Sequence, residues 1–397
     1  MLPDCPPLDF QAEIEQLIRE TEANGGLAPL DVEKFWADQD RSARDPFGKS
    51  IPQLPLTTWP MSGDIIYDEL GIPEDGLRYR QDDAWRAEVT RAYNDRAERI
   101  VGRRLLDDNL ADPARTYPPV KELHDVFEAS QEWQSGSWWL HQSANDADEL
   151  ARLLDRVEQR DVRSFILPAG WDAARTRLMA QGIRPPQYTV QRGPVTFATS
   201  IYGCENLIFL IMDQPELAIR FGNVILRVML DIRKVLEEEA GFTRETAPRS
   251  FSFNDDNCYL LTSEMYEMFG FPILQGVFDY CAPSPQHRRY QHSDSAMGHL
   301  LPVLARLNLT GCNFGPMLTV REIRAAMPGT VIDGQLDPMV YCRNDQREIL
   351  RQLFRDFDQA RENRGLVFTT AGVVNNGTRL TSLRLIMAAI QRYCRYQ

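Results

Sequence analysis

From Ser137 onward, short apolar runs alternate with amphipathic helical segments, and this alternation constrains the fold more than any other feature of the chain. The runs that predict strands are 137–140, 162–167, 188–197, 250–254, 290–293, 311–314, 330–332 and 366–370. The helical segments that follow them are 146–159, 172–181, 206–239, one beginning near 263, 296–307, 320–326, 345–363 and 381–395. Repeated strand-then-helix units predict a parallel sheet with helices outside it. About eight such units favour an α/β fold of the (β/α)8 TIM-like barrel type, and an open doubly wound sheet is the alternative.

The first part of the chain is polar and helical instead. The predicted helices cover 10–22, 31–43 and 82–110, and a proline-rich stretch covers 46–60. Roughly 250 residues suffice for one barrel. We therefore expect 1–130 to be a mostly helical N-terminal extension packed on a barrel formed by 131–397.

Composition and charge exclude several classes of protein. A formal net charge of −13 argues against nucleic acid, whose phosphates need clustered Lys and Arg. No apolar run approaches the roughly 20 residues of a membrane span, and Met1–Phe10 lacks the pattern of a signal peptide. The cysteines are Cys5, Cys204, Cys258, Cys281, Cys312, Cys342 and Cys394. Their odd number and the lack of a C-x-x-C pair do not fit a disulfide framework, so we expect mostly buried thiols and a cytoplasmic protein.

Polar residues follow several of the predicted strands, at the position where α/β barrels carry their chemistry. The candidates for catalysis and for metal binding are Asp256, His292 and Asp294. The candidates for substrate binding are Thr199, Tyr202, Asn254, Gln335, Asp337 and Asn375. The alternative for each is an ordinary turn former or helix cap, because Asp and Asn are common in both.

Two pairs of residues are informative through their spacing. Asp255 and Asp256 are adjacent, so only one of them is expected to face the barrel mouth. His292 and Asp294 are two residues apart and therefore share one side of a strand. That spacing suits two ligands of one metal ion or an acid–base pair, with a satisfied polar pair as the structural alternative. Imidazole and carboxylate ligands favour zinc, iron or manganese.

Several segments, in this order along the chain, resemble the uroporphyrinogen decarboxylase superfamily. They are 193–198 (GPVTFA), 202–206 (YGCEN), 253–256 (FNDD), 261–266 (LTSEMY), 292–295 (HSDS), 333–338 (DGQLDP) and 377–382 (GTRLTS). The 292–295 segment is similar to the H-S-D-G element of the divergent, decarboxylase-like branch. The resemblance implies the same barrel fold, a small-molecule substrate and a homodimer.

The chain also departs from that family, and the departures shape the expected function. Residues 1–60 lack the arginine-rich element with which uroporphyrinogen decarboxylases grip their substrate, and residues 370–377 contain no histidine. The resemblance therefore implies a decarboxylase-like lyase that acts on a small carboxylated or methylated molecule, outside haem synthesis.

Two other functions stay open. One is metal-dependent methyl transfer with a corrinoid carried by a partner protein. In that branch the zinc site resembles H-x-C plus a later cysteine; here His292 matches, but Asp294 replaces the first cysteine and the later one is absent. The resemblance then implies a harder site for a divalent metal, zinc first, built from His292, Asp294 and Asp256. The other function is that of a non-catalytic, ligand-binding member of the family.

Overall fold

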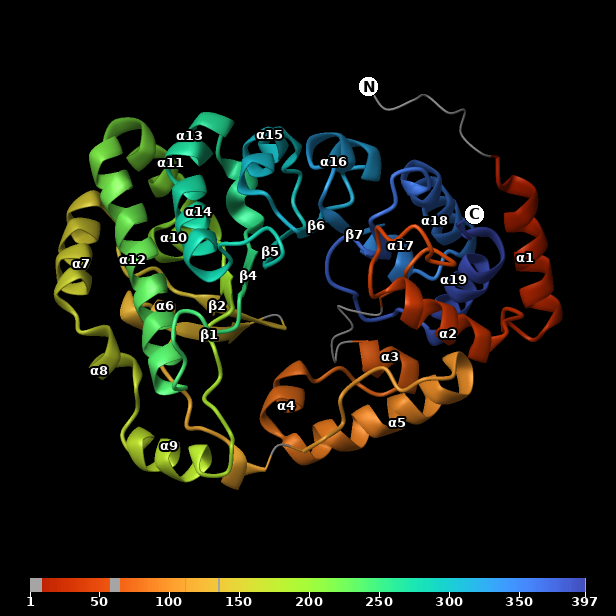
Figure 1. Cartoon of the computed structure of the whole chain (residues 1–397), viewed down its shortest axis with the longest axis horizontal. Helices are drawn as coiled ribbons and strands as arrows, with labels where there is room; N and C mark the ends of the chain where they lie inside the picture. The colour runs from red at the N-terminus through yellow and green to blue at the C-terminus, as the bar shows by residue number, and fades with distance from the viewer. Residues whose placement is uncertain (1–8, 58–64, 111, 135, 397) are drawn as a thin grey trace. The chain divides into compact units, whose positions relative to one another are not determined.

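The computed structural model describes residues 9–57, 65–110, 112–134 and 136–396, and Cys5 lies outside them. The chain divides into two compact units. One comprises Met1–Leu110 with Gly311–Gln397, and the other comprises Ala111–Thr310. Figure 1 shows the elements of both. The expected division into an extension and a barrel at residue 131 stays a prediction.

The unit that contains both ends of the chain carries helices from the first hundred residues beside the last strands. Its helices are α1 (Gln11–Ala23), α2 (Val32–Ser42), α3 (Ile66–Leu70), α4 (Gly76–Gln81), α5 (Asp83–Val101), α16 (Val320–Ala326), α17 (Pro338–Cys342), α18 (Gln346–Ala360) and α19 (Leu380–Tyr393). Its strands are β6 (Gly311–Phe314), β7 (Val331–Leu336) and β8 (Leu366–Thr370). Helix α19 packs against α5 and α18, so the two ends of the sequence share one core.

The unit Ala111–Thr310 contains a short hairpin, three parallel strands and most of the remaining helices. Its strands are β1 (Gln131–Gln134), β2 (Ser137–Leu140), β3 (Val190–Arg192), β4 (Ser250–Asn254) and β5 (Arg288–Ser293). Its α-helices are α6 (Leu123–Val126), α7 (Ala147–Gln159), α8 (Val162–Ile166), α9 (Trp171–Met179), α10 (Pro194–Tyr202), α11 (Cys204–Asp213), α12 (Pro215–Glu239), α13 (Ser263–Met268), α14 (Gly270–Cys281) and α15 (Leu301–Leu304). Short 3-10 turns cover Pro113–Arg115, Asp256–Leu260, Gly298–Leu300 and Ala305–Leu307.

Both units are built on parallel strands. In one, β3 pairs with β4 and β4 with β5; in the other, β6 pairs with β7 and β7 with β8. Helices α16 and α18 pack on β7, and α14 packs on β4. The fold is therefore mixed α/β with parallel strands, as the alternation predicts, and it is consistent with a TIM-like fold. Closure into a barrel stays a prediction.

Local sequence explains why the helices begin where they do, and α7 is a clear case. The Asp146 carboxylate accepts a hydrogen bond of 2.7 Å from the backbone N–H of Glu149, which caps the first turn. Residues Leu150, Leu153, Leu154 and Val157 are buried and follow the helical repeat. That apolar stripe packs on α12, which also contacts α8, α11 and α14.

Several predicted elements differ from the structure in type, length or pairing. Segment 162–167 forms helix α8, because the Asp161 carboxylate caps it by accepting from the N–H of Ser164 at 2.8 Å. The strand predicted over 188–197 covers only Val190–Arg192, because Pro194 opens helix α10. Segment 137–140 is a strand with the predicted bounds, but it pairs antiparallel with β1 as a hairpin and lies outside the parallel sheet. Helix α5 ends at Val101, because Gly102 follows it with a φ of 77°.

Two further sequence expectations concern membranes and cysteines. No single helix in the described ranges is long and apolar enough to cross a membrane, whereas α10 and α11 together, bent by 102°, have the necessary length and composition. The described cysteines are unpaired, and Cys258, Cys281, Cys312 and Cys394 are buried. The expectation of mostly buried thiols is confirmed for these residues.

We expect the aromatic cluster around α12 to contribute much of the stability of its unit. Phe221 is fully buried, and its ring centroid lies 6.2, 6.4 and 5.9 Å from those of Phe127, Tyr202 and Phe269. Phe221→Ala should lower the free energy of unfolding by about 3–5 kcal/mol through lost burial and a cavity, measured by urea denaturation. Phe209→Ala removes a ring that is 58% exposed and should cost less than about 0.5 kcal/mol. Equal losses in the two variants would contradict this packing.

Candidate functional site

The register of β3, β4 and β5 places three polar side chains in one row at the carboxyl ends of the strands. Arg192 pairs with Asn254, and Asn254 pairs with His292. Neighbouring residues of a strand alternate between the faces of the sheet. Phe251 and Phe253 are fully buried on one face, so Asn254 and its row face the other side.

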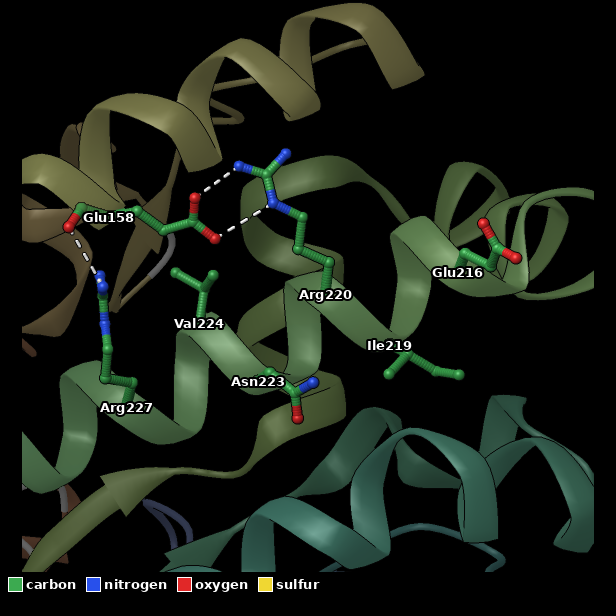
Figure 2. Close-up of a pocket in the computed structure, with 7 residues that line it drawn as sticks. All are labelled: Glu158, Glu216, Ile219, Arg220, Asn223, Val224 and Arg227. Carbon is green, nitrogen blue, oxygen red and sulfur yellow. Dashed lines mark hydrogen bonds and ion pairs between the residues drawn. The ribbon is translucent and has the colours of Figure 1, made fainter.

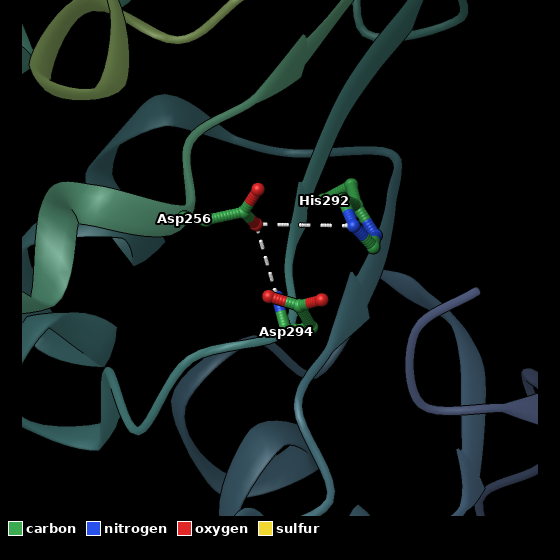
Figure 3. Close-up of side chains that lie close together, drawn as sticks. All are labelled: Asp256, His292 and Asp294. Carbon is green, nitrogen blue, oxygen red and sulfur yellow. Dashed lines mark hydrogen bonds and ion pairs between the residues drawn. The ribbon is translucent and has the colours of Figure 1, made fainter. Parts of the chain in front are cut away.

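Three side chains gather just beyond this row. Asp256 starts the turn after β4, His292 lies at the end of β5, and Asp294 follows it. Each offers a ligand atom, and these atoms all lie within 4.8 Å of one another (Figure 3). Nε2 of His292 is 3.9 Å from Oδ1 of Asp256, and the backbone N–H of Asp294 donates to that same oxygen at 3.2 Å. His292 and Asp294, which are two positions apart in the sequence, thus both lie beside Asp256.

The three groups differ in their exposure. The side chain of His292 is 12% exposed and that of Asp256 is 41% exposed, while Asp294 is exposed. Burial raises the pKa of Asp256, and repulsion from the Asp294 carboxylate raises it further, while His292 acts in the opposite direction. Two carboxylates held this close repel each other unless a proton or a cation lies between them.

This donor set fits a divalent metal ion. Two carboxylate oxygens and one imidazole nitrogen are ligands that zinc, iron and manganese accept. Three protein ligands leave a coordination position open, as in catalytic zinc sites. Asp256, His292 and Asp294 are therefore the residues that could hold a metal, and their roles as metal ligands or catalytic groups stay predictions.

The neighbouring carboxylate, Asp255, is buried on the opposite side of the backbone. Its Oδ1 accepts a hydrogen bond of 2.8 Å from the N–H of Thr196 at the start of α10. A Cβ atom on Gly193 would lie 2.1 Å from the Cβ of Asp255, so only glycine allows this close approach. Burial raises the pKa of Asp255 to about 7. The expectation that only one of the adjacent pair faces outward is confirmed, because Asp255 is fully buried and Asp256 is not.

The predicted substrate-binding residues are distributed over both units. Thr199 and Tyr202 lie within α10, buried, and they do not follow a strand directly. Oγ1 of Thr199 accepts a hydrogen bond of 2.7 Å from Nδ2 of Asn257, which holds the turn after β4 on α10. Asn254 is exposed, in the row with His292.

The other three candidates belong to the unit that contains β7 and β8, where each has a local structural contact. Nε2 of Gln335 donates to the carbonyls of Gly315 and Leu318 at 3.1 and 2.8 Å and so holds the loop after β6. The Asp337 carboxylate caps α17 by accepting from the N–H of Met339 at 2.8 Å. Asn375 is exposed, and its Nδ2 lies 3.8 Å from the sulfur of Met339. Substrate binding by these residues stays a prediction.

Sequence reasoning missed Arg192. It is half-buried at the end of β3, and its Nη1 donates a hydrogen bond of 3.2 Å to Oγ of Ser200. Burial lowers the pKa of its guanidinium, and the negative charges of Asp256 and Glu122 oppose that shift. The signal that could have found it is Pro194, which ends the strand at Arg192 and makes it the strand-end residue.

A separate hollow lies on the outer surface of the same unit, beside α12. It has a volume of about 460 Å³, and Figure 2 shows Arg220 and Arg227 beside Glu158 at its edge. Arg220 donates two hydrogen bonds to the Glu158 carboxylate, at 3.1 and 2.6 Å, and Arg227 donates to the Glu158 carbonyl at 3.1 Å. Arg220 and Glu158 therefore pair with each other at this hollow, whereas Arg227 donates to backbone carbonyls.

Comparison with known proteins finds a solved structure whose fold is similar to that of this chain. A methyltransferase from Methanosarcina mazei is similar, with a TM-score of 0.55 and 12% sequence identity. The match covers 86% of this chain and 94% of that one. No family model matches the sequence, and no curated protein matches it. At 12% identity the likeness extends to the fold alone, so the resemblance to the uroporphyrinogen decarboxylase superfamily stays a prediction.

We expect Asp255 to make the stability of the protein depend on pH. Its pKa is about 7 in the folded state and 3.8 when exposed, so the folded state binds the proton more tightly. The contribution of Asp255 to the free energy of unfolding should therefore be greatest below about pH 4 and fall as the pH rises to about 7. Asp255→Asn should remove up to about 4 kcal/mol of this fall, measured by urea denaturation between pH 4 and about 8.

Asp356→Asn in the other unit is the matched control. Asp356 is buried, and burial raises its pKa to about 6. The Asp356→Asn variant should flatten the pH dependence of the free energy of unfolding below about pH 6. It should leave the fall in this free energy between about pH 6 and pH 7 unchanged. A wild-type profile that rises with pH in that last interval, with no effect of Asp255→Asn, would contradict the burial of a carboxyl group there.

Proposed function

We propose that this protein is a divalent-metal-dependent enzyme that transfers a methyl group to a small acceptor. The observation that carries the proposal is the convergence of Asp256, His292 and Asp294, whose ligand atoms lie within 4.8 Å. The fold likeness to a methyltransferase supports the same reaction class. Zinc is the first candidate for the ion, and a corrinoid carried by a partner protein is the candidate methyl donor.

Each of the three residues has a distinct part in this proposal. A bound divalent ion would supply Lewis-acid polarisation and lower the pKa of an acceptor group. His292 contributes a ring nitrogen, Nε2, which lies 3.9 Å from Oδ1 of Asp256. Asp256 is oriented by the N–H of Asp294 and by its own carbonyl, which accepts a hydrogen bond of 2.6 Å from Oγ of Ser295. Asp294 is exposed and offers the second carboxylate ligand.

Decarboxylation of a small carboxylated molecule is the second candidate. Arg192 favours it, because a half-buried guanidinium close to Asp256 can attract a substrate carboxylate. The chemistry would then need a group that donates a proton to the carbon from which carbon dioxide leaves, and His292 is the residue best placed for that. A metal-free protein would favour this candidate.

The decisive experiment measures metal content. Purified wild-type protein should contain close to one equivalent of zinc, iron or manganese by elemental analysis. The double variant His292→Ala, Asp294→Ala should lose it, because only one carboxylate of the ligand set remains. The dissociation constant for zinc, measured by competition with a chromophoric chelator, should rise by at least about 100-fold.

A matched control removes another histidine–carboxylate pair from the same unit. Nε2 of His141 lies 3.1 Å from Oε2 of Glu132, both side chains are exposed, and neither belongs to the three-residue cluster. His141→Ala, Glu132→Ala should leave the metal content unchanged. Wild-type protein that binds none of the three metals, or a control variant that loses metal equally, would overturn the proposal.

A further inference from the structure

Arg192 occupies one end of the row that runs across the sheet to His292. Its neighbour in the row is Asn254, which is exposed, and the next residue is His292. We propose that Arg192 binds the carboxylate of a small substrate whose reacting group is held at Asp256, His292 and Asp294. The inference rests on the proposed function for the place of the reaction, and it names the class of substrate.

The first argument is the number of unused hydrogen-bond donors. A guanidinium has five N–H donors and does not lose its charge in proteins. Within the described parts of the chain, Arg192 makes one side-chain hydrogen bond, to the neutral hydroxyl of Ser200, and no ion pair. A half-buried cation without an anionic partner is costly, so a ligand that supplies one is stabilised.

Other arginines of the same unit show what a fully engaged side chain looks like. Arg233 donates to the Glu237 carboxylate and to the carbonyls of Tyr188 and Pro248. Arg289 donates to the carbonyls of Ala282 and Leu307 and to the carboxylate of Asp279. Arg192 lacks both kinds of contact, which distinguishes it from these structural arginines.

The second argument is charge. Asp256 and Glu122 are the carboxylates that act on the Arg192 guanidinium. Glu122 is 72% exposed and also lies 3.4 Å from Nδ1 of His124, so it is not committed to Arg192. A cation held by Asp256 and Asp294 would neutralise their charges and leave the guanidinium uncompensated. The site with a bound cation would therefore attract an anion more strongly than the metal-free site.

The third argument is size. Neighbouring strands lie about 4.8 Å apart, so Arg192 and His292, with one strand between them, have backbones about 10 Å apart. The long arginine side chain spans part of that distance. A molecule of a few carbons could then reach from the guanidinium, past the amide of Asn254, to the three-residue cluster. A carboxylate suits Arg192 because the planar guanidinium pairs with it through two parallel hydrogen bonds.

Succinate is a suitable probe, and isothermal titration calorimetry of the full-length protein with and without zinc measures its binding. Arg192→Gln should raise the dissociation constant of the zinc-loaded protein by roughly 10- to 100-fold. Arg192→Lys, which keeps the charge but not the paired hydrogen bonds, should have an intermediate effect. Succinamide, the neutral counterpart, should bind wild type and Arg192→Gln equally weakly.

Arg288→Gln is the matched control for the loss of positive charge. Arg288 lies on the same face of β5 as His292, at the amino end of the strand, and it is exposed. The Arg288→Gln variant should bind succinate as wild type does. Circular dichroism and the zinc dissociation constant should be unchanged in all three variants, which separates lost anion binding from lost folding.

The outcomes distinguish this inference from the proposed function. Zinc binding together with succinate affinity that does not depend on Arg192 would overturn the inference and leave the proposed function standing. A protein that binds no metal but binds succinate through Arg192 would retain the inference and remove the proposed function. Failure of wild type to bind succinate in either state would also overturn the inference.

Discussion

The hydrogen-bond ladder between β3, β4 and β5 determines where every polar group of the candidate site lies. Because the pairing is parallel, the ends of the three strands meet at one edge, and a shift of one residue would turn each side chain to the opposite face. The N–H of Asp255 donates to the carbonyl of His292 at 2.9 Å and extends this ladder beyond β4. That bond fixes the start of the turn from which Asp256 approaches Asp294.

The turn after β4 is supported from behind by the beginning of α10. Gly193 allows contact with Asp255, and the N–H of Gly193 donates to the carbonyl of Asn254 at 2.6 Å. The N–H of Asn257 donates to Oγ1 of Thr196 at 2.9 Å. The backbone is therefore held on both sides of Asp256, at Asn254 and at Asn257. A buried carboxyl group at Asp255 is an energetic cost of this arrangement, since burial disfavours its charged form.

Part of this architecture can be predicted from sequence, where short-range signals suffice. Strands 250–254, 311–314 and 366–370 have the predicted bounds, because each is a compact apolar run between polar or turn residues. Asp256, His292 and Asp294 were chosen as candidates by their position near predicted strand ends, and their ligand atoms lie within 4.8 Å of one another. The failures come from signals that compete locally: Asp161 converts an apolar run into helix α8, and Pro194 converts half of another into α10. The second error hid Arg192, since the strand was expected to continue to Phe197.

The charges at the strand ends argue for a ligand more strongly than any one residue does. Asp256 and Asp294 repel each other, and Arg192 lacks an anionic partner within the described residues. Direct pairing of Arg192 with Asp256 would satisfy both, yet Arg192 bonds to Ser200 and Asp256 is oriented toward Asp294 and His292. A cation between the carboxylates and an anion on the guanidinium would satisfy the same groups. These charges are the reason for which we propose both a metal ion and a substrate carboxylate at the strand ends.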